Sequence, residues 1–393
     1  MTPPRILVFV DYFLPGFRAG GPIRTIANMI AHLGDTFAFR VVTRDRDLGD
    51  EVPYSSVQVD SWNAVGNSEV FYASPANDRL SGLMRLMRQT PHDLVYLNSY
   101  FSWRSAGLPL LLRWLGIVPC RPVVLAPRGE FSPGALALKA GKKRLYIRLA
   151  GWLGLYRQVC WQASSEQEAE DIRRALGDSA LRVMVAPNLL PPLAPVEAGS
   201  TAKIPEMVLP SSSALRLVFL SRISPKKNLA FLLQVLAGVD FPISLTIYGP
   251  QEDIAYWQQC EALMAALPSH VAVRHAGVLS PEQVPAALAG HELFVFPTLG
   301  ENFGHVIFEA LKAGLPVLLS DQTPWQSTPD GAVQTLPLDA LAPWREAIQA
   351  QAGLSPSERQ VRRQAAAALA DTMMHSSDRV AANRQLFLEA LGG

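Results

Sequence analysis

The sequence has few cysteines, and their spacing is uninformative as a ligand pattern. Cys120, Cys160 and Cys260 are far apart in a chain of 393 residues. An odd number without a CxxC or Cys/His spacing argues against a disulfide framework and against a zinc site. We therefore expect a reducing, cytoplasmic location.

Long apolar runs are also missing. The run at 6–10 is closed by Asp11 and is too short for the core of a signal peptide. Pro109 and Arg113 interrupt the apolar stretch at 106–118. The sequence therefore predicts no spanning helix, and any contact with the inner face of a membrane must be peripheral.

Neither charge is in excess. Lysine and arginine number 35 against 34 aspartates and glutamates, so no overall field attracts nucleic acid and any anion site must be local. Hydrophobic residues make up 49% and charged residues 18%, which is typical of a folded globular protein and not of a disordered one.

What is present is an alternation of short Val/Ile/Leu-rich runs with amphipathic segments, which is typical of α/β domains with parallel sheets. The length favours two such Rossmann-like domains. The expected strands are 5–10, 37–43, 94–97, 123–126, 159–163, 182–185, 215–220, 244–248, 271–275, 293–296 and 317–320.

A proline-rich stretch at 191–213 has little periodicity and is the expected linker between the domains. The first domain is then 1–190 and the second is 214–375. The last segment, 376–393, is expected to form a helix that packs back toward the first domain.

The strongest motif is GENFGHVIFEAL at 300–311, which follows the expected strand at 293–296 and opens a helix. Backbone amides around Asn302, Phe303 and Gly304 would present a positive helix end to phosphate or sugar oxygens. Glu309 could accept two hydroxyls of a ribose, and Glu301 lies where a donor sugar would sit.

The segment ENFGHVIFEALKAGLPVLLSD, with two glutamates eight apart, resembles the signature of glycosyltransferase family 4 enzymes. The resemblance implies a GT-B fold, with two domains facing a central cleft and closing C-terminal helices. It implies that Glu301 is catalytic near the donor sugar and that Glu309 binds the nucleotide ribose.

The same resemblance implies a retaining hexosyltransferase of polysaccharide or lipopolysaccharide biosynthesis. Its donor would be a UDP- or GDP-sugar and its acceptor a glycan or a lipid-linked molecule. It implies front-side displacement, although the residues leave a covalent double displacement open.

A basic loop follows the expected strand at 215–220, in the segment SRISPKKNL. Arg222 and Lys227 would stabilise the charge of a departing diphosphate, so that no metal is required. The pair resembles the diphosphate clamp of the family. We interpret Lys226 as a solvated neighbour.

A glycine-rich loop containing Gly20 and Gly21 follows the first strand. It lacks the GxGxxG spacing of dinucleotide sites and is weak evidence alone, but it matches the glycine-rich donor-side loop of the family. Asp45-Arg46-Asp47 imitates a metal-binding DxD motif, and we interpret it as a solvated loop. We expect neither a metal nor a cofactor.

Acceptor-side residues are expected after two strands of the first domain. Arg128, Gly129 and Glu130 follow the strand at 123–126, in a segment that resembles the acceptor side of family members. Glu130 could orient an acceptor hydroxyl or pair with Arg128. Asn98 and Gln162 stand where many members have histidine, which puts any histidine-assisted step in doubt.

The stretch at 138–156 interleaves basic and apolar residues at helical spacing. This pattern suits peripheral contact with an anionic membrane and equally an ordinary solvated helix.

Two other functions stay open. A two-domain sugar-nucleotide epimerase would share the architecture but need no acceptor, and a non-catalytic member would bind nucleotide or glycan within a larger assembly.

Overall fold

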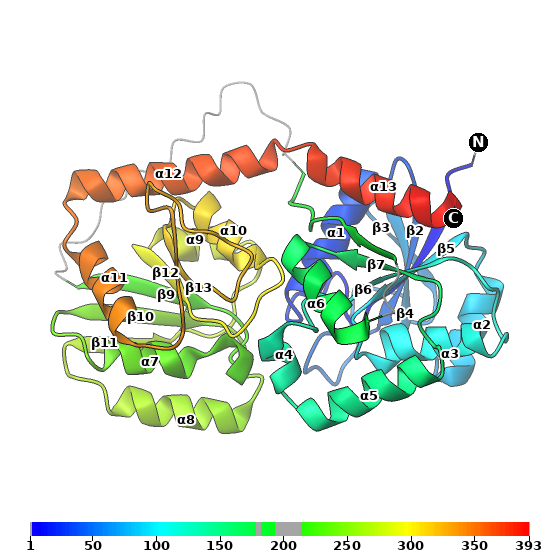
Figure 1. Cartoon of the computed structure of the whole chain (residues 1–393), viewed down its shortest axis with the longest axis horizontal. Coiled ribbons are helices and arrows are strands. Elements are labelled where there is room, and N and C mark those ends of the chain that lie inside the picture. Colours follow the sequence, from blue (N-terminus) through cyan, green and yellow to red (C-terminus); the bar gives the residue numbers. More distant parts are fainter. Residues whose placement is uncertain (1, 178–181, 193–213, 393) are drawn as a thin grey trace. The chain divides into compact units, whose positions relative to one another are not determined.

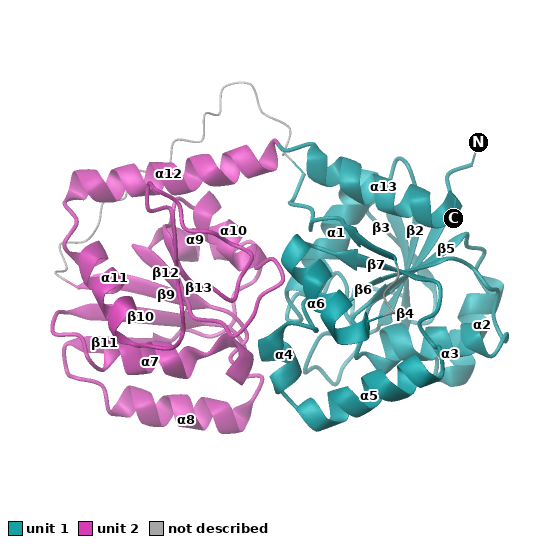
Figure 2. Cartoon of the chain, viewed as in Figure 1, with its two compact units in different colours: residues 1–192, 376–393 teal, residues 193–375 magenta. Residues whose placement is uncertain are grey.

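The computed structural model describes residues 2–177, 182–192 and 214–392, which form two compact units (Figure 1). Unit 1 comprises residues 1–192 and 376–393, and unit 2 comprises residues 193–375 (Figure 2). Most of the linker expected at 191–213 lies outside the described residues. None of the described helices is long and apolar enough to cross a membrane.

The sheet of unit 1 has the order β3-β4-β2-β1-β5-β6-β7-β8 within the described chain. All pairs are parallel except β3 with β4. The strands are β1 (Arg5–Phe9), β2 (Ala38–Arg44), β3 (Trp62–Val65), β4 (Ser68–Ala73), β5 (Leu94–Asn98), β6 (Val123–Ala126), β7 (Val159–Ala163) and β8 (Arg182–Val185).

The helices of unit 1 cover both faces of this sheet. They are α1 (Gly21–Leu33), α2 (Leu80–Gln89), the π-helix η1 (Trp103–Gly107), α3 (Leu108–Trp114), α4 (Pro133–Ala137), α5 (Ala140–Trp152), α6 (Glu166–Leu176) and α13 (Asp378–Gly392). Side chains alternate between the two faces along β1. Leu7 and Phe9 pack on one face with residues of α2, α3 and α6, and Ile6 and Val8 pack on the other face with residues of α1 and α13.

The last helix, α13, is therefore part of unit 1. The ring of Phe387 packs edge-on against Phe37, Phe39 and Tyr96, with centroids 5.5, 6.2 and 5.3 Å away. These aromatic contacts bury the apolar face of α13 on the sheet.

The sheet of unit 2 is parallel throughout its described strands, in the order β11-β10-β9-β12-β13-β14. This is the doubly wound order 3-2-1-4-5-6 of dinucleotide-binding folds. The strands are β9 (Leu215–Leu220), β10 (Ile243–Tyr248), β11 (Val271–His275), β12 (Leu293–Phe296), β13 (Val317–Ser320) and β14 (Val333–Leu336).

Helices again flank the sheet of unit 2. They are the short 3₁₀ helix η3 (Pro225–Lys227), α7 (Leu229–Leu236), α8 (Ile254–Ala265), α9 (Val284–Ala289), α10 (His305–Lys312), α11 (Ala342–Ala352) and α12 (Pro356–Met374).

The expected α/β class with two parallel sheets is confirmed, but three strands escaped prediction. The β3–β4 hairpin turns at Gly66-Asn67, and its half-exposed first strand has little apolar alternation. The short strand β14 extends the edge of the second sheet beside β13. β3 and β14 are edge strands of the described sheets, and edge strands carry weak apolar patterns because one side of each has no neighbouring strand to bury it. β4 lies between β3 and β2 and is buried at five of its six residues, so its position in the sheet does not explain why it escaped prediction.

Candidate functional site

The carboxyl ends of β9 and β12 lie side by side at the switch point of unit 2, where the strand order reverses. Parallel sheets bind ligands at such points. The loop after β9 carries Arg222 and Lys227, and the loop after β12 carries Glu301. The two loops are tied together, because Leu299 N donates to Lys226 O at 2.8 Å.

Lys227 and Glu301 form a close ion pair at this point. Lys227 Nζ lies 2.5 Å from Glu301 Oε2, and their side chains are 12% and 17% exposed. The ammonium also lies 5.1 Å from the centroid of the Phe296 ring, and Asn302 N donates to Glu301 Oε1 at 3.2 Å. The pair therefore lies against Phe296, the last residue of β12.

The electrostatic surroundings keep Glu301 ionised. Burial by itself raises the pKa of this carboxyl, but the charges of Lys227 and Lys226 and the hydrogen bonds outweigh burial and lower the pKa below its usual value. Glu301 is thus an acceptor of hydrogen bonds at neutral pH and not a proton donor.

Arg222 has a different partner, Glu252, which the sequence analysis missed. Arg222 Nη1 lies 2.7 Å from Glu252 Oε1, and both side chains are 36% exposed. The structure does not bring Arg222 and Lys227 onto one shared carboxylate among the described residues. Gly249 lies against this loop with φ of 132°, and a Cβ there would lie 1.9 Å from Ser221 O.

The signature loop enters α10 through Gly304. Its φ is 75°, and a Cβ there would lie 2.6 Å from Ile307 Cδ1 and 3.0 Å from Glu301 Cγ, so both the backbone conformation and the close side chains favour glycine. Phe303 O accepts from Trp325 Nε1 at 2.6 Å. Among the amides expected to bind an anion, that of Asn302 donates to the Glu301 carboxylate. Glu309 is half-buried within α10.

In unit 1, Arg128 organises the expected acceptor-side residues. It donates to Asn98 Oδ1 at 2.9 Å, to Asn188 Oδ1 at 2.7 Å and to Tyr96 Oη at 2.6 Å. Tyr96 in turn donates to Gln162 Oε1 at 2.5 Å. Arg128 therefore pairs with neutral groups and not with Glu130, which corrects one of the two readings of Glu130.

Gln162 extends this network to the last helix. Its Nε2 donates to Ala186 O at 2.9 Å and to Asn383 Oδ1 at 3.1 Å, and the side chain is buried. The residue that stands in place of the family histidine is thus a structural link between β7 and α13.

Glu130 instead closes the chain after β5. Its carboxylate accepts from Ser99 Oγ at 2.6 Å, Tyr100 N at 2.5 Å and Phe101 N at 3.1 Å. Burial raises its pKa, against these hydrogen bonds.

Glu168 is a second buried carboxylate in this region. Its carboxylate accepts from Gly129 N at 2.5 Å and from Ser164 N at 2.8 Å. Its backbone amide donates to Ser165 Oγ, the N-cap of α6. Glu130 and Glu168 therefore hold both loops that carry the acceptor-side candidates.

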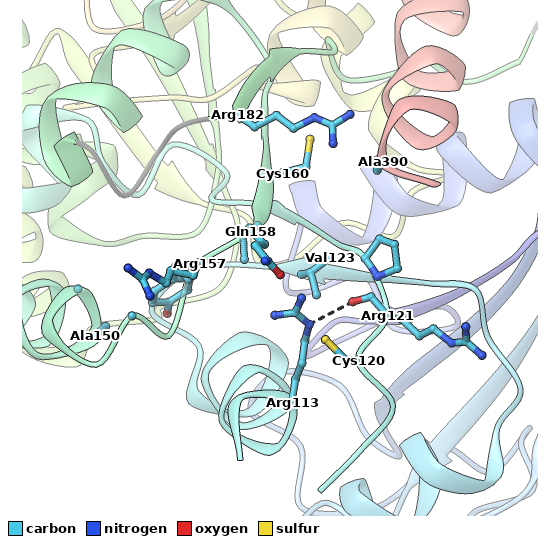
Figure 3. Close-up of a pocket in the computed structure, with 15 residues that line it drawn as sticks. Arg113, Cys120, Arg121, Val123, Ala150, Arg157, Gln158, Cys160, Arg182 and Ala390 are labelled. Atoms are coloured by element: carbon cyan, nitrogen blue, oxygen red, sulfur yellow. Dashed lines mark hydrogen bonds between the residues drawn. The ribbon is translucent and has the colours of Figure 1, made fainter. Parts of the chain in front are cut away.

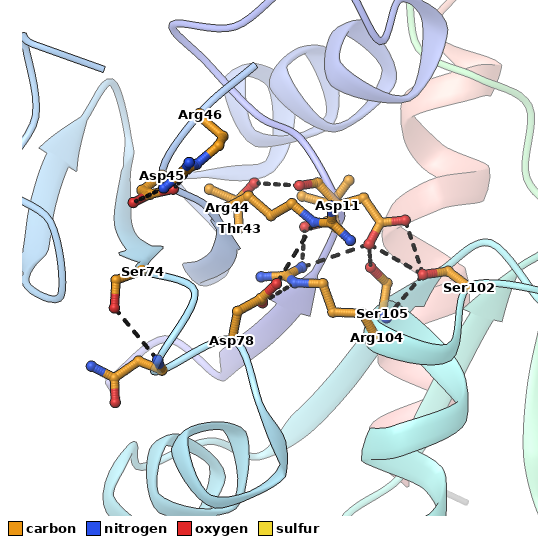
Figure 4. Close-up of polar contacts among 12 residues, drawn as sticks. Asp11, Thr43, Arg44, Asp45, Arg46, Ser74, Asp78, Ser102, Arg104 and Ser105 are labelled. Carbon is orange, nitrogen blue, oxygen red and sulfur yellow. Dashed lines mark hydrogen bonds and ion pairs between the residues drawn. The ribbon is translucent and has the colours of Figure 1, made fainter. Parts of the chain in front are cut away.

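A further polar cluster lies at the switch point of unit 1, where β1 and β5 are neighbours (Figure 4). Asp11 accepts from Ser102 Oγ at 2.9 Å and Ser105 Oγ at 2.7 Å. Arg104 binds Val10 O at 2.7 Å and pairs with Asp78. These residues were not predicted from the sequence, although Asp11, directly after a buried strand, was a usable signal.

The glycine-rich loop is held by an aspartate that was expected to be solvated. Asp47 is 5% exposed and accepts from Phe17 N at 2.8 Å and Arg18 N at 3.1 Å. Asp45 is 3% exposed and pairs with Arg46 at 2.8 Å. The solvated-loop interpretation is therefore wrong, because both carboxylates satisfy groups of the fold.

Gly20 and Gly21 stand at the start of α1. Gly20 has φ of 74°, a left-handed conformation that favours glycine, and a Cβ there would meet nothing within 4 Å. The described residues contain no cluster of three or more histidine, cysteine, aspartate or glutamate side chains suited to a metal ion.

Comparisons with known proteins bear on this geometry. A family model described as glycosyl transferases group 1 matches residues 203–327. The O-antigen chain mannosyltransferase B of Escherichia coli is 30% identical over 112 residues, which are 27% of this chain and 28% of that protein. The aligned part is thus about a quarter of each protein.

Solved structures match over nearly the whole chain. Sucrose-phosphate synthase from Thermosynechococcus elongatus has a TM-score of 0.73 at 16% identity, and HepE of Anabaena in complex with UDP and glucose has 0.67 at 16% identity. WaaG, a glycosyltransferase involved in lipopolysaccharide biosynthesis, has 0.65 at 16% identity. Coverage is 99% of this chain in each case and 99 to 100% of the other. The expected GT-B fold is confirmed, and residues 203–327 match the group 1 glycosyltransferase model.

Proposed function

We propose that this protein is a retaining, metal-independent hexosyltransferase that uses a nucleoside-diphosphate sugar. Its acceptor is a glycan or a lipid-linked molecule of polysaccharide or glycoconjugate biosynthesis. The O-antigen relative, named as a mannosyltransferase, favours mannose among the hexoses. HepE binds UDP and glucose, which supports UDP as a candidate nucleotide, together with GDP.

The observation that carries the proposal is the Lys227–Glu301 pair at the switch point of unit 2. We assign the diphosphate to Lys227 and Arg222, because within the described chain each cation is bound to a single carboxylate that an anionic ligand can replace. Glu301, ionised, accepts hydroxyls of the donor sugar, and Glu309 accepts those of the ribose.

These side chains set the chemistry of the proposed reaction. The fixed cations of Lys227 and Arg222 stabilise the negative charge that develops on the leaving phosphate. In other enzymes a divalent metal ion can supply this stabilisation. The amides of Phe303 and Gly304 add the positive end of α10. Arg128, Asn98, Gly129 and Glu130 form the acceptor side, and Gly20 and Gly21 belong to the glycine-rich loop that we assign to the donor.

A nucleotide-release assay with UDP- and GDP-hexoses tests this function. We expect release to require an acceptor, to survive EDTA and to form a product with the anomeric configuration of the donor, as read by NMR. Isomerised donor without an acceptor would identify an epimerase. Nucleotide binding without any turnover across donors and acceptors would identify a non-catalytic member.

We also propose that α5 makes peripheral contact with an anionic membrane, within the stretch 138–156. Leu145, Leu149 and Trp152 are 59%, 51% and 83% exposed and lie on one helical face. Arg144 and Arg148 are exposed beside them. Such a face combines apolar insertion with attraction to anionic lipid.

One of the basic residues of this stretch is not available to a membrane. Lys143 Nζ donates to Ala135 O at 2.6 Å and lies 4.8 Å from the Phe101 ring centroid. Its pKa is lowered by burial. A test of membrane contact should therefore spare Lys143.

Sedimentation with phosphatidylglycerol vesicles tests the contact. Charge reversal at Lys142, Arg144 and Arg148 should abolish cosedimentation, and added salt should weaken that of the wild type. A control reverses the exposed Arg173, Lys312 and Arg384. Equal cosedimentation of both folded variants would assign α5 to an ordinary solvated surface.

A further inference from the structure

A large cavity lies at the amino-terminal ends of β6, β7 and β8 in the sheet of unit 1 (Figure 3). Its volume is about 1040 Å³, and its lining includes Val123, Val159 and Arg182, which are the first residues of β6, β7 and β8. The acceptor-side candidates Asn98 and Arg128 stand at the carboxyl ends of β5 and β6. The cavity is therefore separate from the site described above.

The lining of this cavity is strongly basic. Its described residues include Arg113, Arg121, Arg157 and Arg182 and no aspartate or glutamate. Among the described residues, Arg182 pairs with Glu389, whose carboxylate lies 3.8 Å away, and the charge of Arg121 acts on Asp93, which does not line the cavity. The chain as a whole carries a net charge of only +1, so this concentration of one sign is local.

The guanidinium groups of Arg113 and Arg157 have no ion-pair partner among the described residues. Arg113 Nε donates to Arg121 O at 3.1 Å, which leaves its two terminal nitrogens for another acceptor. Arg157 packs its stem against Gly154 and makes no side-chain hydrogen bond or ion pair with any described residue. Arginines gathered without acids repel one another unless an anion joins them.

Exposed apolar side chains are next in the chain to two lining residues, Arg113 and Gly151. Trp114 and Leu115, which follow Arg113 at the end of α3, are 49% and 52% exposed. Trp152 and Leu153, at the end of α5, are 83% and 39% exposed. Exposed tryptophans beside arginines are typical of surfaces that sit at the boundary between lipid and water.

We propose that this arginine pocket binds the phosphate group of an anionic phospholipid, while the flanking tryptophans lie at the membrane interface. Guanidinium groups bind phosphate oxygens in pairs, and the apolar floor formed by Val123, Val159 and Ala390 suits the glycerol and the start of the acyl chains. The inference rests on the membrane contact proposed for α5 and extends it to a specific headgroup site.

The chain contains its own reporter for this pocket. Cys120 is exposed and lines the cavity, whereas Cys160 and Cys260 are buried. The rate at which the folded protein reacts with a thiol reagent therefore reports Cys120. We expect monomeric dihexanoylphosphatidylglycerol to slow this reaction. Dihexanoylphosphatidylcholine should slow it less, because its choline cation is repelled by the arginines.

The matched variants are Arg113→Gln with Arg157→Gln, and Arg173→Gln with Arg384→Gln, which removes the same charge elsewhere. Loss of each pocket arginine should weaken protection of Cys120 by roughly tenfold, since a hydrogen bond to a charged group is lost. The control pair should protect as the wild type does. If the double variant melts early, Arg157→Lys keeps the charge and should still lose part of the protection.

Protection that is unchanged in the folded pocket variant would overturn the site. Equal protection by inorganic phosphate at the same concentration would overturn the lipid assignment in favour of a free anion. The α5 contact fails separately: its charge-reversed variant would then still sediment with vesicles, while monomeric lipid continues to protect Cys120.

Discussion

The two units have related strand orders around their switch points but treat their cations differently. In unit 1, Arg104 is 7% exposed and is held by Val10 O, Asp78 and, at 3.9 Å, Asp11. In unit 2, Arg222 and Lys227 are 36% and 12% exposed, and each has one carboxylate partner in the described chain.

This difference separates a structural cation from one available to a ligand. Removing Arg104 from its three partners would leave buried acceptors without a donor, which is costly. A diphosphate that approaches Lys227 or Arg222 displaces a single carboxylate and replaces its charge. Unit 2 is therefore the unit whose cations we assign to the donor.

Replacing the buried arginine gives the largest expected effect. Arg104→Met leaves Val10 O without this donor and leaves Asp78 with only the longer Arg44 ion pair, at 3.7 Å, among the described residues, so it should destabilise unit 1 by about 3–5 kcal/mol. Denaturant unfolding measures this, and Arg173→Met on the exposed face of α6 should change stability by less than about 0.5 kcal/mol. A folded Arg104→Met of normal stability would remove the contrast between the units.

Replacing the paired lysine should act on turnover instead. Lys227→Met removes the proposed stabiliser of the leaving group, so the rate of nucleotide release should fall roughly 100-fold or more. Thermal melting checks the fold, and Lys312→Met, at an exposed lysine of α10, serves as the control. Normal turnover in Lys227→Met would place the diphosphate elsewhere.

The loop that carries Arg222 depends on a glycine. Gly249→Ala would place a Cβ 1.9 Å from Ser221 O at a φ of 132°, so unit 2 should lose roughly 2–3 kcal/mol and the Arg222–Glu252 pair should shift. Gly290→Ala is the control, because its nearest atom lies 3.6 Å away. Equal melting temperatures of the two variants would contradict this reading.

The smallest expected effect is on acid stability. The folded pKa of Glu301 is lowered, so its contribution is complete above the ordinary glutamate pKa of about 4.3 and is lost as pH falls through the lowered value. Glu301→Gln should flatten the loss of unit 2 stability in that range, measured by denaturant unfolding at several pH values. Glu346→Gln, on an exposed glutamate, should keep the wild-type slope.

The sequence by itself determined the local elements and the place of the donor motif. Apolar runs such as 293–296 and the glycine at 304 are read within a few residues, because strand burial and helix entry depend on neighbours along the chain. The signature after β12 and the basic loop after β9 were therefore predictable, as was the closing helical tail.

The tertiary structure alone decided which partner each polar side chain takes. Lys227 meets Glu301 because β9 and β12 are neighbours in the sheet, and Glu130 turns to the chain after β5 instead of to Arg128. Asp47 is buried because the chain after β2 lies against the glycine-rich loop that follows β1. Strand order brings together groups that are distant in sequence, and no local pattern of residues encodes that order.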